Sequence, residues 1–242
     1  MNLKGAHALV TGGGVRVGRA IAHGLAREGV HVAIHYNRSE HGARQTAVEA
    51  EAAGVRAALL GADLADAAAA AALAARAEAA LGGLDIVVNS AAIMERRPLE
   101  EVTPEDWDRT INLNLRGAFF VAQGAARVMD ASGGAIVNIA DLAAFERWVG
   151  FPVHAISKAG VVVMTELLAK ALAPRIRVNA VAPGAVLLPE GTSPEERAHL
   201  ERTTPLGHIG AARDVVDAVL SLLRQDFITG HTLVVDGGRR VR

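Results

Sequence analysis

A glycine-rich turn near the start of the chain could bind a pyrophosphate. The segment Thr11–Gly18 reads TGGGVRVG, follows a short apolar run and precedes a helical stretch. Gly12 permits a sharp turn and Gly18 permits close packing of a helix on a strand, while the free N–H groups and positive dipole of the helix start attract an anion. Glycine-rich turns without a ligand also occur, so the motif needs support from the rest of the chain.

A basic and hydroxylic pair stands where a second strand is expected to end. The segment reads His35-Tyr36-Asn37-Arg38-Ser39, and it lies about 20 residues after the turn, where an NAD-preferring protein places Asp or Glu for the ribose hydroxyls. Arg38 can form a charge-assisted fork with a 2′-phosphate, and Ser39 can add a hydrogen bond. The pattern favours NADP(H) over NAD(H), the alternative being a solvated loop arginine.

These groups must be positioned by an alternation of strands and helices. Short apolar runs recur along the chain with helical stretches between most of them, which is typical of a parallel sheet, because parallel neighbours need a crossover connection. A doubly wound α/β fold follows, with seven strands and helices on both faces. The predicted strands are Ala6–Val10, Val30–His35, Val55–Leu60, Leu84–Asn89, Ala135–Ile139, Arg177–Ala182 and Thr232–Val235.

Three helices and one lid can be placed in the same way. Long helices are predicted at Pro104–Met129 and Pro152–Ala173, each opening with a proline, whose missing N–H costs nothing in a first turn. The alanine-rich piece Ala65–Ala80 is predicted to be a solvent-facing helix. The Pro, Glu and Thr-rich segment Val186–Pro205 is interpreted as a lid within a single domain that spans residues 1–242.

Composition excludes several classes of protein. The 242 residues are 51% apolar and 21% charged with a formal net charge of −1, which argues against disorder and against a nucleic-acid partner. The absence of cysteine excludes disulfides and thiolate metal sites, and the nine histidines form no HExxH-like cluster, so we expect no metal. No signal peptide or membrane span is expected, and a cytoplasmic location is predicted.

An ordered set of short motifs extends along nearly the whole chain. The motifs are Thr11-Gly12 with Gly18, Asp63-Leu64, Asn89-Ser90-Ala91-Ala92, Asn114, Ser157-Lys158, Pro183-Gly184 and Asp236-Gly237-Gly238. Together they resemble the short-chain dehydrogenase/reductase family, which implies a Rossmann fold. Within that family, Arg16 in a T-G-x-x-x-R-x-G turn and the HYNRS segment are similar to the pteridine reductases. The resemblance implies NADP(H) contacts from Thr11, Gly12, Arg16, Val17, Gly18, Tyr36, Asn37, Arg38, Ser39, Asp63, Leu64, Asn89, Ala91, Lys158, Pro183 and Gly184.

The resemblance also implies a catalytic set with one departure. The family places a Tyr four residues before its Lys, a spacing that puts both on one helix face. Here Lys158 is preceded by His154, and the only tyrosine is Tyr36. Asp141 stands where most members have Ser and where pteridine reductases have Asp. By resemblance, Lys158 would bind the nicotinamide ribose and Asn114 would hold a water on the proton path.

His154 could take the vacant role of the proton donor. An imidazolium is a competent general acid near neutral pH, since the ordinary pKa of histidine is about 6.5. The Asp141 carboxylate would stabilise the imidazolium and the Lys158 ammonium would destabilise it. One alternative is a proton delivered through a water linked to Asp141, and another is a protein that binds NADP(H) with little or no catalysis.

The substrate is the least determined part of the sequence. Pteridine reductases are similar in placing an aromatic ring where this chain has Met94, and a thioether offers less flat surface for a pterin. Arg16, Met94 and Leu187 are the expected substrate contacts, although Met94 could equally fill the core. Arg96 and Arg97 are interpreted as solvated. We expect reduction of a C=N or C=O bond in a small pteridine-like heterocycle or a carbonyl compound, by a homotetramer or a dimer.

Overall fold

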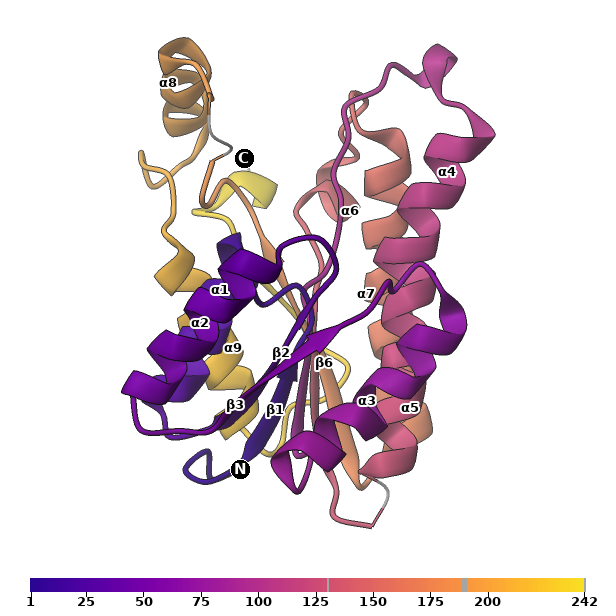
Figure 1. Cartoon of the computed structure of the whole chain (residues 1–242). Helices are drawn as coiled ribbons and strands as arrows, with labels where there is room; N and C mark the ends of the chain where they lie inside the picture. Colours follow the sequence, from indigo (N-terminus) through magenta and orange to yellow (C-terminus); the bar gives the residue numbers. More distant parts are fainter. Residues whose placement is uncertain (130, 189–190, 242) are drawn as a thin grey trace.

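A single parallel sheet forms the middle layer of the molecule (Figure 1). The computed structural model describes residues 1–129, 131–188 and 191–241. The seven strands stand in the order β3-β2-β1-β4-β5-β6-β7, which confirms the predicted doubly wound Rossmann fold. They are β1 (His7–Val10), β2 (His31–Tyr36), β3 (Ala57–Gly61), β4 (Ile86–Asn89), β5 (Gly134–Ile139), β6 (Ile176–Pro183) and β7 (Thr232–Val235).

The strand order reverses between β1 and β4. The chain moves outward from β1 through β2 to β3 and then returns to pair β4 with the other side of β1. In open parallel sheets, ligands bind at such a switch point, beyond the carboxyl ends of the strands. Thr11 joins the two ends there, because its Oγ1 accepts hydrogen bonds from the backbone N of Ser90 (2.9 Å) and of Ala91 (3.0 Å).

Helices cover both faces of the sheet and enclose two apolar cores. One face is covered by α1 (Arg16–Arg27), α2 (Glu40–Ala52) and α9 (Ala212–Arg224), and the other by α3 (Ala67–Leu81), α5 (Ala118–Val128) and α7 (Pro152–Leu172) (Figure 1). Because the strands are buried on both sides, they read as continuous apolar runs rather than as alternating patterns.

The predicted alanine-rich helix forms as α3, but only one of its sides faces solvent. One side of α3 is buried against α5, and Leu73 and Leu81 on it belong to the apolar core of that face. The packing is close enough that a Cβ on Gly124 of α5 would lie 2.3 Å from the backbone O of Ala71. Small side chains therefore serve here to let two helices approach, a role that composition alone does not reveal.

The long helix predicted at Pro104–Met129 has an interruption. It consists of α4 (Pro104–Ile111), a π-helical turn at Asn112–Gly117 and α5. A Cβ on Gly117 would lie 2.5 Å from the backbone O of Leu64, so the helix passes directly against the loop after β3 at this turn. Widened turns of this kind often occur at functional sites, and this one carries Asn114.

The remaining helical pieces are short and frame the carboxyl edge of the sheet. They are η1 (Leu99–Glu101), α6 (Ala143–Glu146), α8 (Pro194–Thr203) and η3 (Arg239–Val241). The predicted lid Val186–Pro205 contains α8, and positions 189 and 190 of it lie outside the described residues. Among the described helices, none combines the length and the apolar character needed to cross a bilayer.

Candidate active site

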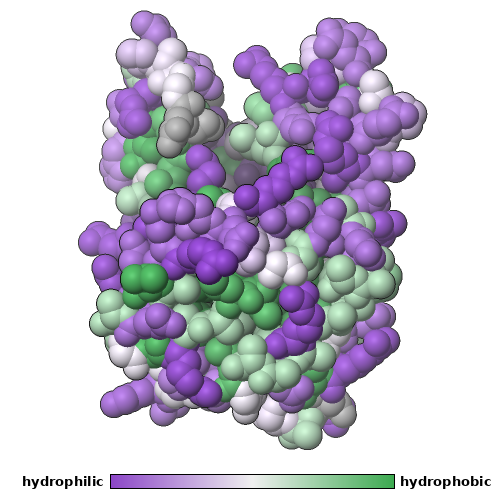
Figure 2. Space-filling view, viewed as in Figure 1, coloured by the Kyte–Doolittle hydropathy of each residue, from purple (hydrophilic) through white to green (hydrophobic). Residues whose placement is uncertain are grey.

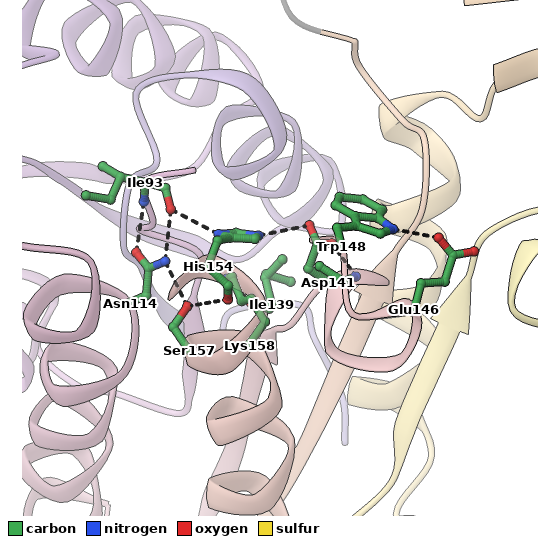
Figure 3. Close-up of polar contacts among 10 residues, drawn as sticks. Ile93, Asn114, Ile139, Asp141, Glu146, Trp148, His154, Ser157 and Lys158 are labelled. Carbon is green, nitrogen blue, oxygen red and sulfur yellow. Dashed lines mark hydrogen bonds and ion pairs between the residues drawn. The ribbon is translucent and has the colours of Figure 1, made fainter. Parts of the chain in front are cut away.

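His154 lies in the first turn of α7 with its ring in the interior (Figure 3). Its side chain is 4% exposed, and its Nδ1 is 3.1 Å from the backbone O of Ile93. A carbonyl only accepts hydrogen bonds, so Nδ1 carries a hydrogen and Nε2 is the atom that can gain or lose a proton. Nε2 is buried, has no hydrogen-bond partner among the described residues and lies 3.6 Å from Oδ2 of Asp141.

Lys158 lies one turn further along the same face of α7. Its Nζ donates a hydrogen bond of 2.7 Å to the backbone O of Ile139, at the end of β5. Burial lowers the pKa of the Lys158 ammonium from its ordinary 10.5 to about 8, and the nearby Asp141 carboxylate acts in the opposite direction. A cation is thus held inside the protein at the carboxyl edge of the sheet.

Asn114 holds the backbone carbonyl that orients His154. Its Oδ1 accepts from the backbone N of Ile93 (2.9 Å), and its Nδ2 donates to the backbone O of Ile93 (2.9 Å) and to Oγ of Ser157 (3.1 Å). Ser157 in turn donates to the backbone O of His154 (2.7 Å). Asn114 therefore links Ile93, in the segment after β4, to Ser157 of α7.

Asp141 lies between the buried cluster and solvent. Its side chain is 23% exposed, and its Oδ1 accepts a hydrogen bond of 2.8 Å from the backbone N of Ala143, at the start of α6. That bond leaves Oδ2 turned toward His154 (Figure 3). The four predicted residues Asn114, Asp141, His154 and Lys158 are therefore brought together from the helical turn after α4, the end of β5 and α7.

The glycine-rich turn has the close approaches expected of a phosphate cradle. A Cβ on Gly18 would lie 2.3 Å from the backbone O of Gly12, and one on Gly14 would lie 2.8 Å from the backbone N of Ala43. Gly12 has a φ of +65°, which favours glycine. Val17 follows within the first turn of α1, whose first N–H groups have no acceptor within the helix. This arrangement fits the pyrophosphate of a dinucleotide.

The end of β2 lies against this turn. Asn37 and Arg38 are exposed, and Oγ of Ser39 is 3.1 Å from the place where a Cβ on Gly14 would lie. The ring of Tyr36 instead packs over Gly61 at the end of β3. Ser39 therefore stands beside the phosphate turn, and the exposed Arg38 directly precedes it in the chain.

The other predicted cofactor residues divide between surface and interior. Leu64 is buried, and Asp63 closes its own loop by accepting from the backbone N of Ala65 (3.0 Å). Asn89 turns its amide inward and donates to Oδ1 of Asn138 (2.9 Å). Pro183 ends β6, and Gly184 passes so close to Asp236 that a Cβ would lie 2.8 Å from the aspartate Cβ.

None of the predicted substrate residues Arg16, Met94 and Leu187 is buried. Arg16, with a φ of +49°, donates from Nη2 to the backbone O of Leu187 (2.5 Å), which joins the start of α1 to the segment 186–205. Met94 is 45% exposed, so its alternative interpretation as core filler is wrong.

Arg97 is not simply solvated, because its Nε is 3.3 Å from Oδ2 of Asp106. Figure 2 shows the surface hollowed between the part that carries α8 and the part that carries α4.

Three further residues of the site carried no assigned role at the level of sequence. Ile93 acts through its backbone, which leaves no signature in residue type. Ser157 stood in a family motif, and its contact with Asn114 gives it a positioning role. Trp148 supplies an aromatic surface in the segment between Asp141 and His154, where its Nε1 donates to Oε2 of Glu146 (2.6 Å).

Comparison with known proteins extends over the whole chain. The sequence pattern of the family described as enoyl-(acyl carrier protein) reductase matches residues 14–240. The chain is 39% identical to 3beta-hydroxysteroid dehydrogenase 1 of Eggerthella lenta, over 98% of this chain and 94% of that protein.

Two solved structures have the same fold along their full length. A mutant of a Serratia marcescens short-chain dehydrogenase/reductase superposes with a TM-score of 0.93 at 35% identity, over 99% of this chain and 100% of that one. The FolM alternative dihydrofolate reductase 1 of Brucella canis, complexed with NADP, superposes with a TM-score of 0.93 at 30% identity, over 100% of this chain and 96% of that one.

Proposed function

The chain belongs to the short-chain dehydrogenase/reductase family, and on that premise we propose that it is an NADP(H)-dependent reductase in which His154 delivers the proton. The substrate is a small molecule whose C=N or C=O bond is reduced. The observation that carries the proposal is the buried Nε2 of His154, which has no hydrogen-bond partner among the described residues. A buried polar atom without a hydrogen-bond partner destabilises the folded protein, unless a bound ligand supplies the partner.

The proton chemistry follows from the two nitrogens of the ring. Nδ1 stays bonded to the backbone O of Ile93, so the ring cannot rotate freely and Nε2 faces the site. When His154 is an imidazolium, the Asp141 carboxylate at 3.6 Å stabilises it, and Nε2–H is the donor to the substrate. After the transfer, neutral His154 recovers a proton from solvent past the partly exposed Asp141.

The cofactor would be held by the glycine-rich turn, by Arg38 and Ser39 on the 2′-phosphate and by Lys158 on the nicotinamide ribose. The nicotinamide, when bound, supplies the hydride chemistry of the family. Its hydrogen bond to the backbone O of Ile139 fixes Lys158 at the edge of the sheet, where the ammonium would donate to the ribose hydroxyls.

A pteridine-like heterocycle is the substrate class we favour. Arg16 occupies the position that the pteridine reductases use, and the Brucella canis relative is a dihydrofolate reductase by name. Arg16 already contacts Leu187 at the start of the proposed lid, residues 186–205. Met94 offers a thioether where those reductases have a ring, and Trp148 offers the aromatic surface that Met94 lacks.

We further propose that the protein is a homotetramer. Three apolar side chains on α7, namely Ile156, Val163 and Leu167, are 50%, 63% and 55% exposed. Their spacing of seven and four residues places them on one helix face. An apolar stripe of this kind is expected to pack against another copy of the chain, and light scattering of the purified protein measures the number of copies.

The test follows the loss of NADPH absorbance against dihydropterins, dihydrofolate, quinonoid heterocycles, cyclic imines and simple ketones. His154→Ala is compared with wild type and with His231→Ala, which removes an exposed histidine at the start of β7. We expect turnover by wild type and by His231→Ala, and a loss of about 100-fold or more in His154→Ala.

Two outcomes would contradict the proposal in different ways. Undiminished turnover in His154→Ala removes histidine from the proton step. Tight NADPH binding without turnover on every compound favours the alternative, a cofactor-binding protein with no significant catalysis. That alternative draws on the placement of the only tyrosine, Tyr36, whose ring packs over Gly61 on the cofactor side.

A further inference from the structure

A buried histidine outside the proton chemistry joins three strand ends at the cofactor edge. His35 is the residue before the last of β2, and it is 2% exposed. Its Nδ1 is 3.2 Å from the backbone N of Gly12 in the phosphate turn, and its Nε2 is 3.1 Å from the backbone O of Ala62 after β3. Its own backbone O accepts from the N of Gly13 (3.0 Å).

The two ring contacts fix the protonation state of His35. The N–H of Gly12 can only donate, so Nδ1 must present a lone pair, and the carbonyl of Ala62 can only accept, so Nε2 must carry the hydrogen. An imidazolium would direct two N–H groups at each other between Nδ1 and Gly12. The ring is therefore neutral, with its single hydrogen on Nε2.

The contact determines which way the phosphate turn faces. Because the amides of Gly12 and Gly13 are both bonded to His35, they point toward β2. The carbonyl of Gly12 then faces Gly18, where a Cβ would lie only 2.3 Å away. An anion at this turn must bind to the amides that follow, at the start of α1.

We propose that His35 is a positioning residue for NADP(H), whose neutral ring accepts the Gly12 amide and so orients the phosphate turn. The proposal rests on the proposed cofactor of this chain. In it, Ala62 selects the tautomer of His35, and that tautomer sets the direction of the Gly12 peptide. Since Ala62 directly precedes Asp63 and Leu64, the same ring fixes the spacing between the phosphate turn and these two predicted cofactor residues.

The surroundings of the ring are consistent with a neutral form. The pKa of His35 is lowered to about 4, mainly by burial and also by Arg76 of α3, while the hydrogen bond to Ala62 and the Asp63 carboxylate act in the opposite direction. Arg76 lies close because its Nη1 donates to the backbone O of Gly61 (3.1 Å). The geometry above requires the neutral ring independently of these influences.

The test compares two variants of the full-length protein, each of which can keep one of the two hydrogen bonds of the His35 ring. In His35→Asn, the amide oxygen can take the place of Nδ1 and accept from Gly12, whereas in His35→Gln the amide nitrogen can take the place of Nε2 and donate to Ala62. We expect the Kd for NADPH to rise about tenfold or more in His35→Gln and to stay within about threefold of wild type in His35→Asn. Both variants lose one buried contact, so their Tm values should fall alike.

This matched pair separates positioning from mere structural support. A His35→Gln variant that binds NADPH like wild type overturns the proposal, and so does a His35→Asn variant that binds as weakly as His35→Gln. Wild type that fails to bind NADPH would instead refute the proposed function. The two failures are therefore distinguishable.

A measurement on the unmodified protein covers the case in which both variants unfold. Long-range ¹H–¹⁵N spectra of histidine-labelled protein report which ring nitrogen of His35 carries the hydrogen. We expect a neutral ring with the hydrogen on Nε2 and no titration between about pH 5 and 8. A hydrogen on Nδ1, or titration within this range, overturns the proposal.

Discussion

Replacing Lys158 by Met should make the protein more stable while it removes activity. The Lys158 ammonium is buried, with 4% of the residue exposed, and its pKa is lowered from 10.5 to about 8 by desolvation. Since each tenfold change in proton affinity corresponds to about 1.4 kcal/mol, the charged form destabilises the folded state by roughly 3 kcal/mol. Methionine has a similar length and carries no charge.

The sign of the pH dependence follows from the direction of the shift. The pKa of Lys158 is lower in the folded than in the unfolded chain, so the destabilisation is complete below about pH 8 and disappears as pH rises toward about 10.5. The stability advantage of Lys158→Met should therefore be largest near neutral pH. Between about pH 7 and 9.5 it should shrink by about 2 kcal/mol.

One compensating loss limits the absolute gain. The backbone O of Ile139 loses its 2.7 Å hydrogen bond from Nζ, which costs about 1–3 kcal/mol. This loss is much the same at every pH, so it reduces the advantage of the variant without changing its slope. The slope is the quantity that tests the reasoning.

Urea unfolding of wild type and Lys158→Met, followed by circular dichroism at several pH values, measures this slope. Lys170→Met is the matched control, because Lys170 is an exposed lysine on the same helix. The control should show no comparable trend, since an exposed ammonium keeps its hydration. A stability difference that is constant with pH, or one that grows with pH, would refute the account of Lys158 as a desolvated cation.

Three further predictions concern the cofactor and the proton donor. Arg38→Ala should raise the Kd for NADPH by about 10- to 100-fold and leave that for NADH nearly unchanged, because only NADPH carries the 2′-phosphate; fluorescence titration with both nucleotides measures this, and equal losses would contradict it. Gly18→Ala should abolish NADPH binding and lower the Tm, because the added Cβ would lie 2.3 Å from the backbone O of Gly12; unchanged binding in a calorimetric titration would show that the turn is not the phosphate cradle. Asp141→Asn removes the carboxylate 3.6 Å from Nε2 of His154, so turnover should fall about tenfold or more at an unchanged NADPH Kd; turnover equal to that of wild type would exclude a role for this pairing.

The sequence determined the architecture because periodic apolar runs encode it directly. Each of the seven strands lies within two residues of its predicted ends, and the helix beginning at Pro152 ends one residue before its predicted end. Short buried strands separated by helices allow few arrangements, since parallel connections are right-handed and neighbours in sequence pair in space. The glycine-rich turn and the end of β2 could likewise be recognised, because the demands of backbone geometry and phosphate charge restrict residue type.

Features that depend on contacts between distant segments were determined only by the tertiary structure. The π-helical turn at Asn112–Gly117 arises where Gly117 meets the backbone O of Leu64, a close approach that no local pattern announces. The burial of one side of α3 depends on α5 in the same way. Propensity describes a helix by itself, and packing determines which of its faces meets solvent.

At the site, the sequence shows which chemical groups are present, whereas the fold determines their hydrogen-bond partners and their protonation states. Residue type named His154 as a possible acid, and only the backbone carbonyl of Ile93, 3.1 Å from Nδ1, determines which nitrogen can exchange a proton. His35 stood in a recognised segment, and only its two backbone partners on neighbouring strands show that its ring is a neutral acceptor. Hydrogen-bond direction and desolvation are properties of the surroundings of a side chain, and those surroundings exist only once the chain has folded.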